Sequence, residues 1–165
     1  MKVYPAIIFL FSITAFAQQP GLPIPANHFI LNKAGVALDG FDAVSYFNKM
    51  PLEGKAEFAP KHEGVIHRFA SEINKETFKK EPDKYVPEYG GWCAYVVGNS
   101  GEKVEPDFEN FKIVDGKINL FYKNFFTNIL GDWNKDEANL HNKALKNWHK
   151  IVAQSVTIRR DYYDG

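Results

Sequence analysis

The stretch FKIVDGKINLFY, residues 111–122, carries the clearest structural signal of the chain. Two runs rich in β-branched and aromatic residues flank the pair Asp115-Gly116. Such a pair fits a two-residue hairpin turn, in which both central residues take a positive φ. The stretch therefore predicts an antiparallel β-hairpin.

Helical patterns lie on both sides of this hairpin. After it, apolar residues recur at helical spacing from His141 to Val152, and Asn134 with Glu137 fits a capping box at the start of this long helix. Before it, Ser71 is placed to cap a helix over residues 72–80. The pattern predicts an α+β fold that is compact, with a short antiparallel sheet or hairpin and several helices.

Shorter elements fill the remaining sequence. Pro82 and Asp83 suit the first turn of a short helix that ends near Val86. The stretch GVIHRFAS, residues 64–71, alternates as a β-strand does. The stretch ALDGFDAVSYF, residues 37–47, predicts a turn at Asp39-Gly40 followed by a short helical turn.

Length and composition limit the domain count and the class of partner. The chain has 165 residues, of which 45% are hydrophobic, which is enough for one domain with a core of its own. Twenty basic residues balance twenty acidic ones, so no overall field attracts nucleic acid or an anionic membrane. We therefore expect no nucleic-acid partner.

The N-terminus has the pattern of a secretory signal peptide. A basic start precedes the apolar run AIIFLFSITAF, and Ala15-Phe16-Ala17 provides a small-x-small cleavage motif before Gln18. A membrane anchor is the alternative, but the run is shorter than the roughly 20 residues that a span needs. We expect a soluble, exported protein, periplasmic or secreted, with no membrane association after cleavage.

The chain then divides into four parts. A proline-containing, extended lead-in follows the signal, and the polar C-terminal tail is either frayed or a late strand. The expected boundaries are 1–17 for the signal peptide, 18–28 for the lead-in, 29–152 for the folded domain and 153–165 for the tail.

Several of these stretches together resemble the YHS-domain proteins, in the exported single-domain form common in bacteria. The resemblance spans about residues 36–152 and implies a compact YHS-type domain. It rests on ALDGFDAVSYF (37–47), HRFASEINKETF (67–78), EPDKYVPEYGGWCAY (81–95), FKIVDGKINLFY (111–122) and KALKNWHKIV (143–152).

The resemblance implies a non-catalytic binding module, with a metal ion, copper first, as the ligand class. Some YHS domains carry two cysteines in a Phe-Cys-Ser-x-x-x-Cys stretch. This chain has Ala70 and Asn74 at those places, so it lacks that thiolate pair. Fold resemblance does not by itself fix function.

Cys93 is the only cysteine, and its position has two interpretations. If Gly90-Gly91 leads into a helix, Cys93 lies in the first turn, where backbone N–H groups favour a thiolate. A redox or sensor role would follow. The alternative is a packed cysteine within an apolar block. A dithiol cycle within one chain is excluded in either case.

A metal site would need histidine as well. None of the five histidines forms an HxH, HExxH or i, i+4 pair. A mixed site of Cys93 with His67, or with His62, would suit Cu(I) or Zn(II). His67 is the preferred candidate because it lies on the strand-like segment that leads into the resemblance.

A small-molecule or protein-binding surface is the second hypothesis. Its candidate residues are Asp42, Tyr46, Tyr89 and Trp92, which either line an apolar groove or belong to the core. For Asp42 the structural alternative is a cap on the turn over residues 43–47. No nucleophile elbow, phosphate loop or dinucleotide motif is present, so we expect no enzyme activity.

Overall fold

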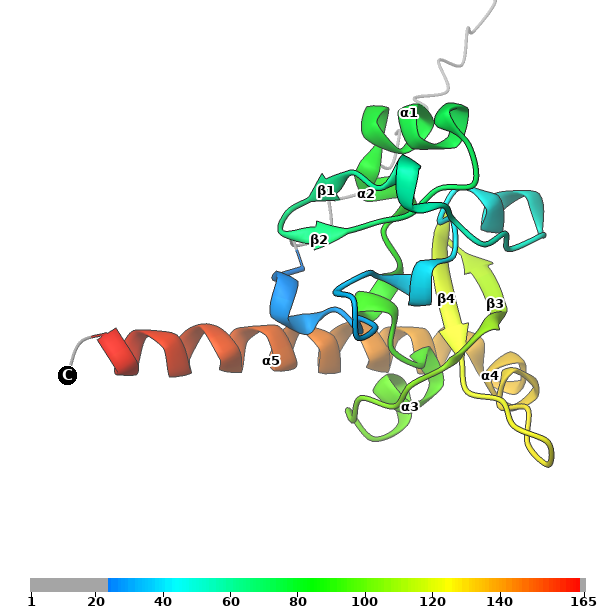
Figure 1. Ribbon diagram of the computed structural model, residues 1–165. Helices are drawn as coiled ribbons and strands as arrows, with labels where there is room; N and C mark the ends of the chain where they lie inside the picture. Colours follow the sequence, from blue (N-terminus) through cyan, green and yellow to red (C-terminus); the bar gives the residue numbers. More distant parts are fainter. Residues whose placement is uncertain (1–23, 164–165) are drawn as a thin grey trace, which may run out of the picture.

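The predicted hairpin is present in the computed structural model, which describes residues 24–163 and side chains up to residue 154 (Figure 1). Strand β3 (Asp107–Val114) pairs antiparallel with β4 (Lys117–Phe121), with a register shift between Asp107 and Phe111. The turn residues Asp115 and Gly116 have φ of 48° and 76°. The hairpin prediction is confirmed. The predicted signal peptide and its cleavage site lie outside the described residues.

Strand β4 connects the two main parts of the core. Because alternate side chains of a strand point to opposite faces, Ile118 and Leu120 pack into one apolar cluster and Phe121 packs into another. The first cluster contains Tyr46, Phe69 and Phe78, and the second contains Tyr89, Trp133, Leu140, Ala144 and Trp148.

Three helices cover the second cluster. They are α3 (Ala94–Asn99), α4 (Leu130–Lys135) and α5 (Glu137–Tyr163). In Figure 1 helix α5 runs across the molecule as one long helix, with α3 just below it. Gly98 allows α3 to approach α5 closely, since a Cβ at this position would lie 2.6 Å from Leu140 O.

Two sequence predictions about this region are wrong. Asn134 lies inside α4 and accepts a hydrogen bond from Lys112 Nζ, so it does not cap α5. Glu137 Oε2 accepts a bond from Trp133 Nε1 at 3.0 Å. The boundary expected at Val152 does not end an element either, because α5 continues to Tyr163.

The first cluster is covered by a small hairpin and two helices. Strands β1 (Lys61–His62) and β2 (Val65–Ile66) pair antiparallel, and α1 (Glu72–Lys80) and α2 (Pro82–Tyr85) follow. The cap of α1 is confirmed, since Ser71 Oγ accepts a bond from Asn74 N at 3.2 Å. Only two residues of the stretch 64–71 form a strand.

Short 3-10 helical turns link these elements. They are Ala26–His28, Leu38–Gly40, Ser45–Asn48, Ala56–Phe58 and Glu88–Gly91. The fold is thus mixed α+β and compact, as predicted, with five α-helices and two small antiparallel sheets in the described part. None of the described helices is long and apolar enough to span a membrane.

Candidate functional site

Cys93 is packed and uncharged. It precedes α3 as its N-cap residue and is fully buried. Its Sγ accepts a hydrogen bond from Tyr122 N at 3.2 Å, and its backbone N donates to Val104 O at 3.0 Å. Burial raises the pKa of the thiol, against the smaller opposing effect of backbone N–H groups. The six-residue helix therefore does not make Cys93 a thiolate, and the geometry is that of a structural cysteine.

The double glycine before Cys93 serves a tight turn. Tyr89, Gly90 and Gly91 all have positive φ, at 55°, 62° and 87°. A Cβ at Gly90 would lie 2.6 Å from His28 O. Both glycines are thus required by backbone geometry, and the motif does not by itself indicate a reactive centre.

The four residues of the predicted groove do not meet in one groove. Tyr46 belongs to the first apolar cluster, whereas Tyr89 and Trp92 belong to or pack on the second. Their polar atoms are engaged within the fold: Tyr46 Oη donates to Phe108 O at 2.7 Å, and Trp92 Nε1 donates to His28 O at 2.7 Å. Burial raises the pKa of the Tyr46 hydroxyl. These aromatics are core residues.

Asp42 is the fourth of these residues, and its carboxylate is fully hydrogen-bonded. Oδ1 accepts from Val44 N at 2.8 Å and Ser45 N at 3.3 Å. Oδ2 accepts from Ala70 N at 2.9 Å and Asn74 Nδ2 at 2.7 Å. With no exposed surface and four donors around it, Asp42 caps the following turn and ties it to the start of α1.

His67 differs from all these groups. Only 2% of its surface is exposed, and neither ring nitrogen has a hydrogen-bond partner among the described residues. Its ring packs on Phe78 at 4.9 Å between centroids and meets the edge of Phe29 at 6.3 Å. Burial, with a smaller contribution from His62, lowers the pKa of His67 to about 4. The imidazole is therefore neutral at pH 7 and offers one nitrogen lone pair, the other nitrogen carrying a hydrogen.

A second imidazole, His62, lies beside it. The β1–β2 hairpin pairs His62 with Val65 and brings its ring within 6.5 Å of the His67 ring, centroid to centroid. The same ring contacts Phe78 edge-on at 5.7 Å. The two histidines therefore form a pair, here called the histidine pair, over one phenylalanine of α1.

Sequence reasoning named His67 but did not find this pair. His62 entered only as an alternative partner of Cys93, because the turn that brings it opposite Val65 depends on Glu63 and Gly64 at positive φ. Cys93 itself contacts Val104, Leu120 and Tyr122, and none of these residues contacts His67 in the contacts described above. Within residues 24–154, no group of three or more His, Cys, Asp or Glu side chains converges.

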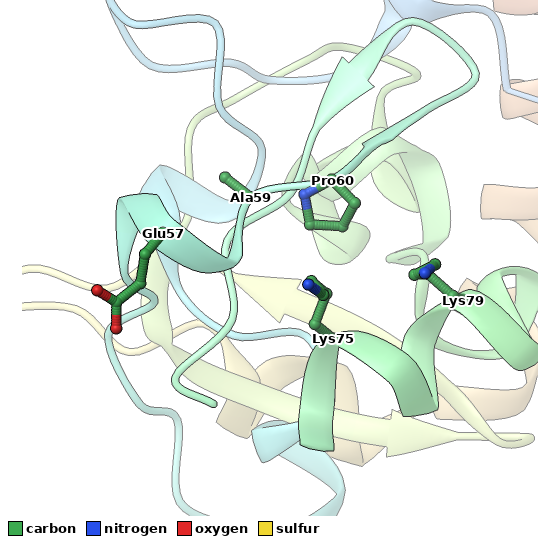
Figure 2. Close-up of a pocket in the computed structure, with 5 residues that line it drawn as sticks. All are labelled: Glu57, Ala59, Pro60, Lys75 and Lys79. Carbon is green, nitrogen blue, oxygen red and sulfur yellow. The ribbon is translucent and has the colours of Figure 1, made fainter. Parts of the chain in front are cut away.

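A pocket of about 240 Å³ lies between the approach to β1 and helix α1 (Figure 2). Its lining residues are Glu57, Ala59, Pro60, Lys75 and Lys79. Lys75 and Lys79 are each paired with a glutamate of the same helix. Neither histidine of the pair lines this pocket, although the backbone of His67 is joined to it, since Pro60 O accepts a bond from His67 N at 3.1 Å. No residue of the predicted groove lines this pocket.

One further cluster was not predicted. Lys103 Nζ lies 5.5 Å from the ring centroids of both Trp92 and Trp148, and 3.0 Å from His28 Nδ1. Partial burial lowers the pKa of this ammonium group. The lysine fills the space that a cationic ligand would take between the two indoles, so this cluster is closed by the chain itself.

Compared with models of protein families, with curated proteins and with solved structures, the chain gives no match.

Proposed function

We propose that this chain is an exported, non-catalytic binding module of the YHS type, periplasmic or secreted, that binds copper as Cu(I) through His62 and His67. One observation carries the proposal: a neutral, buried imidazole, whose two nitrogens have no partner among the described residues, lies beside a second imidazole. A buried polar group without a partner costs free energy, so its retention favours a ligand role.

The chemistry of the donors favours Cu(I). Imidazole nitrogen is a good ligand for copper, and Cu(I) accepts two ligands in a linear arrangement. Structural zinc takes four ligands, whereas the described residues offer no third His, Cys, Asp or Glu at this place. The aromatic surroundings, with Phe29 and Phe78 against His67, would exclude water and protect the lower oxidation state.

The spacing of the rings fits a single bridging ion. An ion bound about 2 Å from one nitrogen of each ring would separate the ring centres by about 6 Å. The observed separation is 6.5 Å. Each strand of the hairpin that carries His62 has only two residues, so small movements that admit an ion cost little.

The YHS resemblance supports a metal ion as the ligand, although the two cysteines of other YHS domains are missing from this chain. At the places of the missing cysteines, Ala70 N and Asn74 Nδ2 both donate to Asp42. These positions therefore stabilise the fold, and the proposed ligands lie earlier in the same segment. A redox role for Cys93 has no support, because its thiol is buried and its pKa is raised.

Cu(I) titration against a chromophoric chelator, under reducing and anaerobic conditions, tests the proposal. We expect His62→Ala and His67→Leu each to weaken Cu(I) binding by at least about tenfold, since even outer partners of a metal site contribute that much. His149→Ala, which changes an exposed histidine on α5, is the matched control and leaves binding unchanged.

Circular dichroism of each variant separates a lost ligand from a lost fold. Leucine at position 67 keeps the apolar packing against Phe78, so this variant is expected to remain folded. If the wild-type protein binds Cu(I) no more tightly than the His62→Ala/His67→Leu double variant, the proposal is wrong.

A further inference from the structure

The loop between β4 and α4 exposes two adjacent aromatic side chains. Phe125 is 94% exposed and Phe126 is 90% exposed, and their rings meet edge to face at 5.0 Å. In Figure 1 this loop extends away from the body of the molecule, beside α4. An apolar surface of this kind marks an interaction site.

The loop is held in this shape by its own hydrogen bonds. Asn124 Oδ1 accepts from Phe126 N at 3.0 Å and from Thr127 N at 2.8 Å, and Asn124 N donates to Thr127 O at 2.9 Å. At its base, Asn128 Oδ1 accepts a bond from Asn110 Nδ2 at 3.0 Å. The two rings are thus presented by an ordered turn.

The small area of the loop tip, Phe125 and Phe126, argues against a second copy of the chain as its binding partner. A phenylalanine buries at most about 250 Å². A contact between two such tips would therefore bury about 1,000 Å² in total, below the roughly 1,200 Å² at the lower end of stable interfaces. A bilayer sets no such minimum, because it adapts to the shape that enters it.

The backbone of the tip also suits a bilayer. Backbone groups that enter a membrane must be satisfied internally, and the N–H groups of Phe126 and Thr127 already bind Asn124. Immediately below the rings, Tyr122 and Lys123 provide the residue types that are typical of the headgroup level. Tyr122 Oη accepts a bond from Asn124 Nδ2 at 2.8 Å, which joins this layer to the tip.

Charge around the tip selects the kind of lipid. Lys123 Nζ lies 3.8 Å from Asp107 Oδ2 and is balanced by it. Lys123 is the only charged residue among residues 122–128. Because Asp107 balances it, the tip offers no free positive charge to an anionic surface.

We propose that Phe125 and Phe126 insert into a zwitterionic phospholipid bilayer and hold the protein at its surface. This inference departs from the expectation of no membrane association after signal cleavage. It is independent of the histidine pair, which lies on other elements. The chemistry recognised is the acyl boundary of the bilayer, reached by two rings, with Tyr122 and Lys123 at the level of the headgroups.

Vesicles of phosphatidylcholine test the proposal on the purified protein without residues 1–17, the expected signal peptide, because its apolar run would itself bind lipid. A bimane label on Thr127→Cys is expected to shift its emission to shorter wavelength when vesicles are added. The label reaches this position selectively because Cys93 is fully buried. The matched control is the same label on Ile73→Cys, at an apolar position of α1 that is 78% exposed, and it is expected to show no shift.

A sedimentation assay with the same vesicles measures the contribution of the rings. We expect Phe125→Ser/Phe126→Ser to reduce partitioning by at least about tenfold, while Ile73→Ser, the control for an exposed apolar residue, leaves it unchanged. Both variants share the wild-type N-terminus, so the difference between them reports on the loop. Added salt should leave binding unchanged.

Three outcomes would overturn the proposal. These are equal partitioning of the wild-type and double-serine proteins, an emission shift at Ile73→Cys equal to that at Thr127→Cys, and binding that requires phosphatidylserine. In the first case the two rings do not bind the bilayer.

Discussion

Asp42 and His67 are both buried polar residues near α1, yet their surroundings are opposite. The carboxylate of Asp42 accepts four hydrogen bonds, two at each oxygen. The imidazole of His67 accepts or donates none, at either nitrogen, with the residues that the structure describes. Both were candidate site residues in the sequence, and their exposed fractions, 0% and 2%, are nearly the same.

The difference shows that burial alone does not separate structural from functional polar groups. Asp42 is fully compensated, so its presence is explained by the fold. His67 has no such hydrogen bonds within the described part of the chain, so the described fold does not explain its presence.

Replacement of Asp42 by alanine should cost the most stability. The change leaves four donors without their acceptor, including Ala70 N and Asn74 Nδ2. We expect the free energy of unfolding to fall by about 3–5 kcal/mol, measured by urea denaturation. Asp39→Asn, at an exposed carboxylate, is the control and should change stability by less than about 0.5 kcal/mol. A loss below about 1 kcal/mol for Asp42→Ala would remove the contrast.

Lowering the pH should reduce the stability of the fold through His67. Its pKa is about 4 in the folded protein and lies near 6.5 when the chain is unfolded. Between these values the unfolded chain binds more protons, so stability falls as the pH is lowered from about 6.5 to about 4 and levels off below. The expected loss from this group is roughly 3 kcal/mol, from the linkage between pKa and stability.

The His67→Leu variant isolates this effect. Burial raises the pKa of Glu88, which changes stability in the opposite direction over part of the same range, so the wild-type profile alone is a sum. Denaturation profiles of wild type and His67→Leu between pH 4 and pH 7, subtracted from each other, give the contribution of His67. Two parallel profiles would mean that His67 has a partner after all.

Part of the fold could be predicted from the sequence alone. Local signals were sufficient for the hairpin at Asp115-Gly116, the cap at Ser71 and the short helix at Pro82, because each depends on neighbouring residues. The start of α5 was wrong because Asn134 has another partner, Lys112, from a distant strand. Tertiary contacts decided that case.

The candidate site was predicted less completely, for the same reason. His67 could be singled out, but its neighbour His62 depends on a two-residue strand pairing that periodicity does not reveal. The predicted groove combined residues that β4 separates onto two faces. The exposure of Phe125 and Phe126 was not foreseen, because it results from the bonds that Asn124 makes within the loop.

The smallest expected effect concerns Cys93, the third buried candidate, which we group with Asp42. Its sulfur has a partner, Tyr122 N, and no exposed surface. Cys93→Ala should therefore lower the free energy of unfolding by only about 1 kcal/mol, through lost packing and one weakened hydrogen bond. It should leave Cu(I) affinity unchanged, and the wild-type thiol should react with a labelling reagent only after denaturation. A tenfold loss of Cu(I) affinity in Cys93→Ala would instead make the thiol a ligand, because a satisfied structural cysteine has no route to the metal.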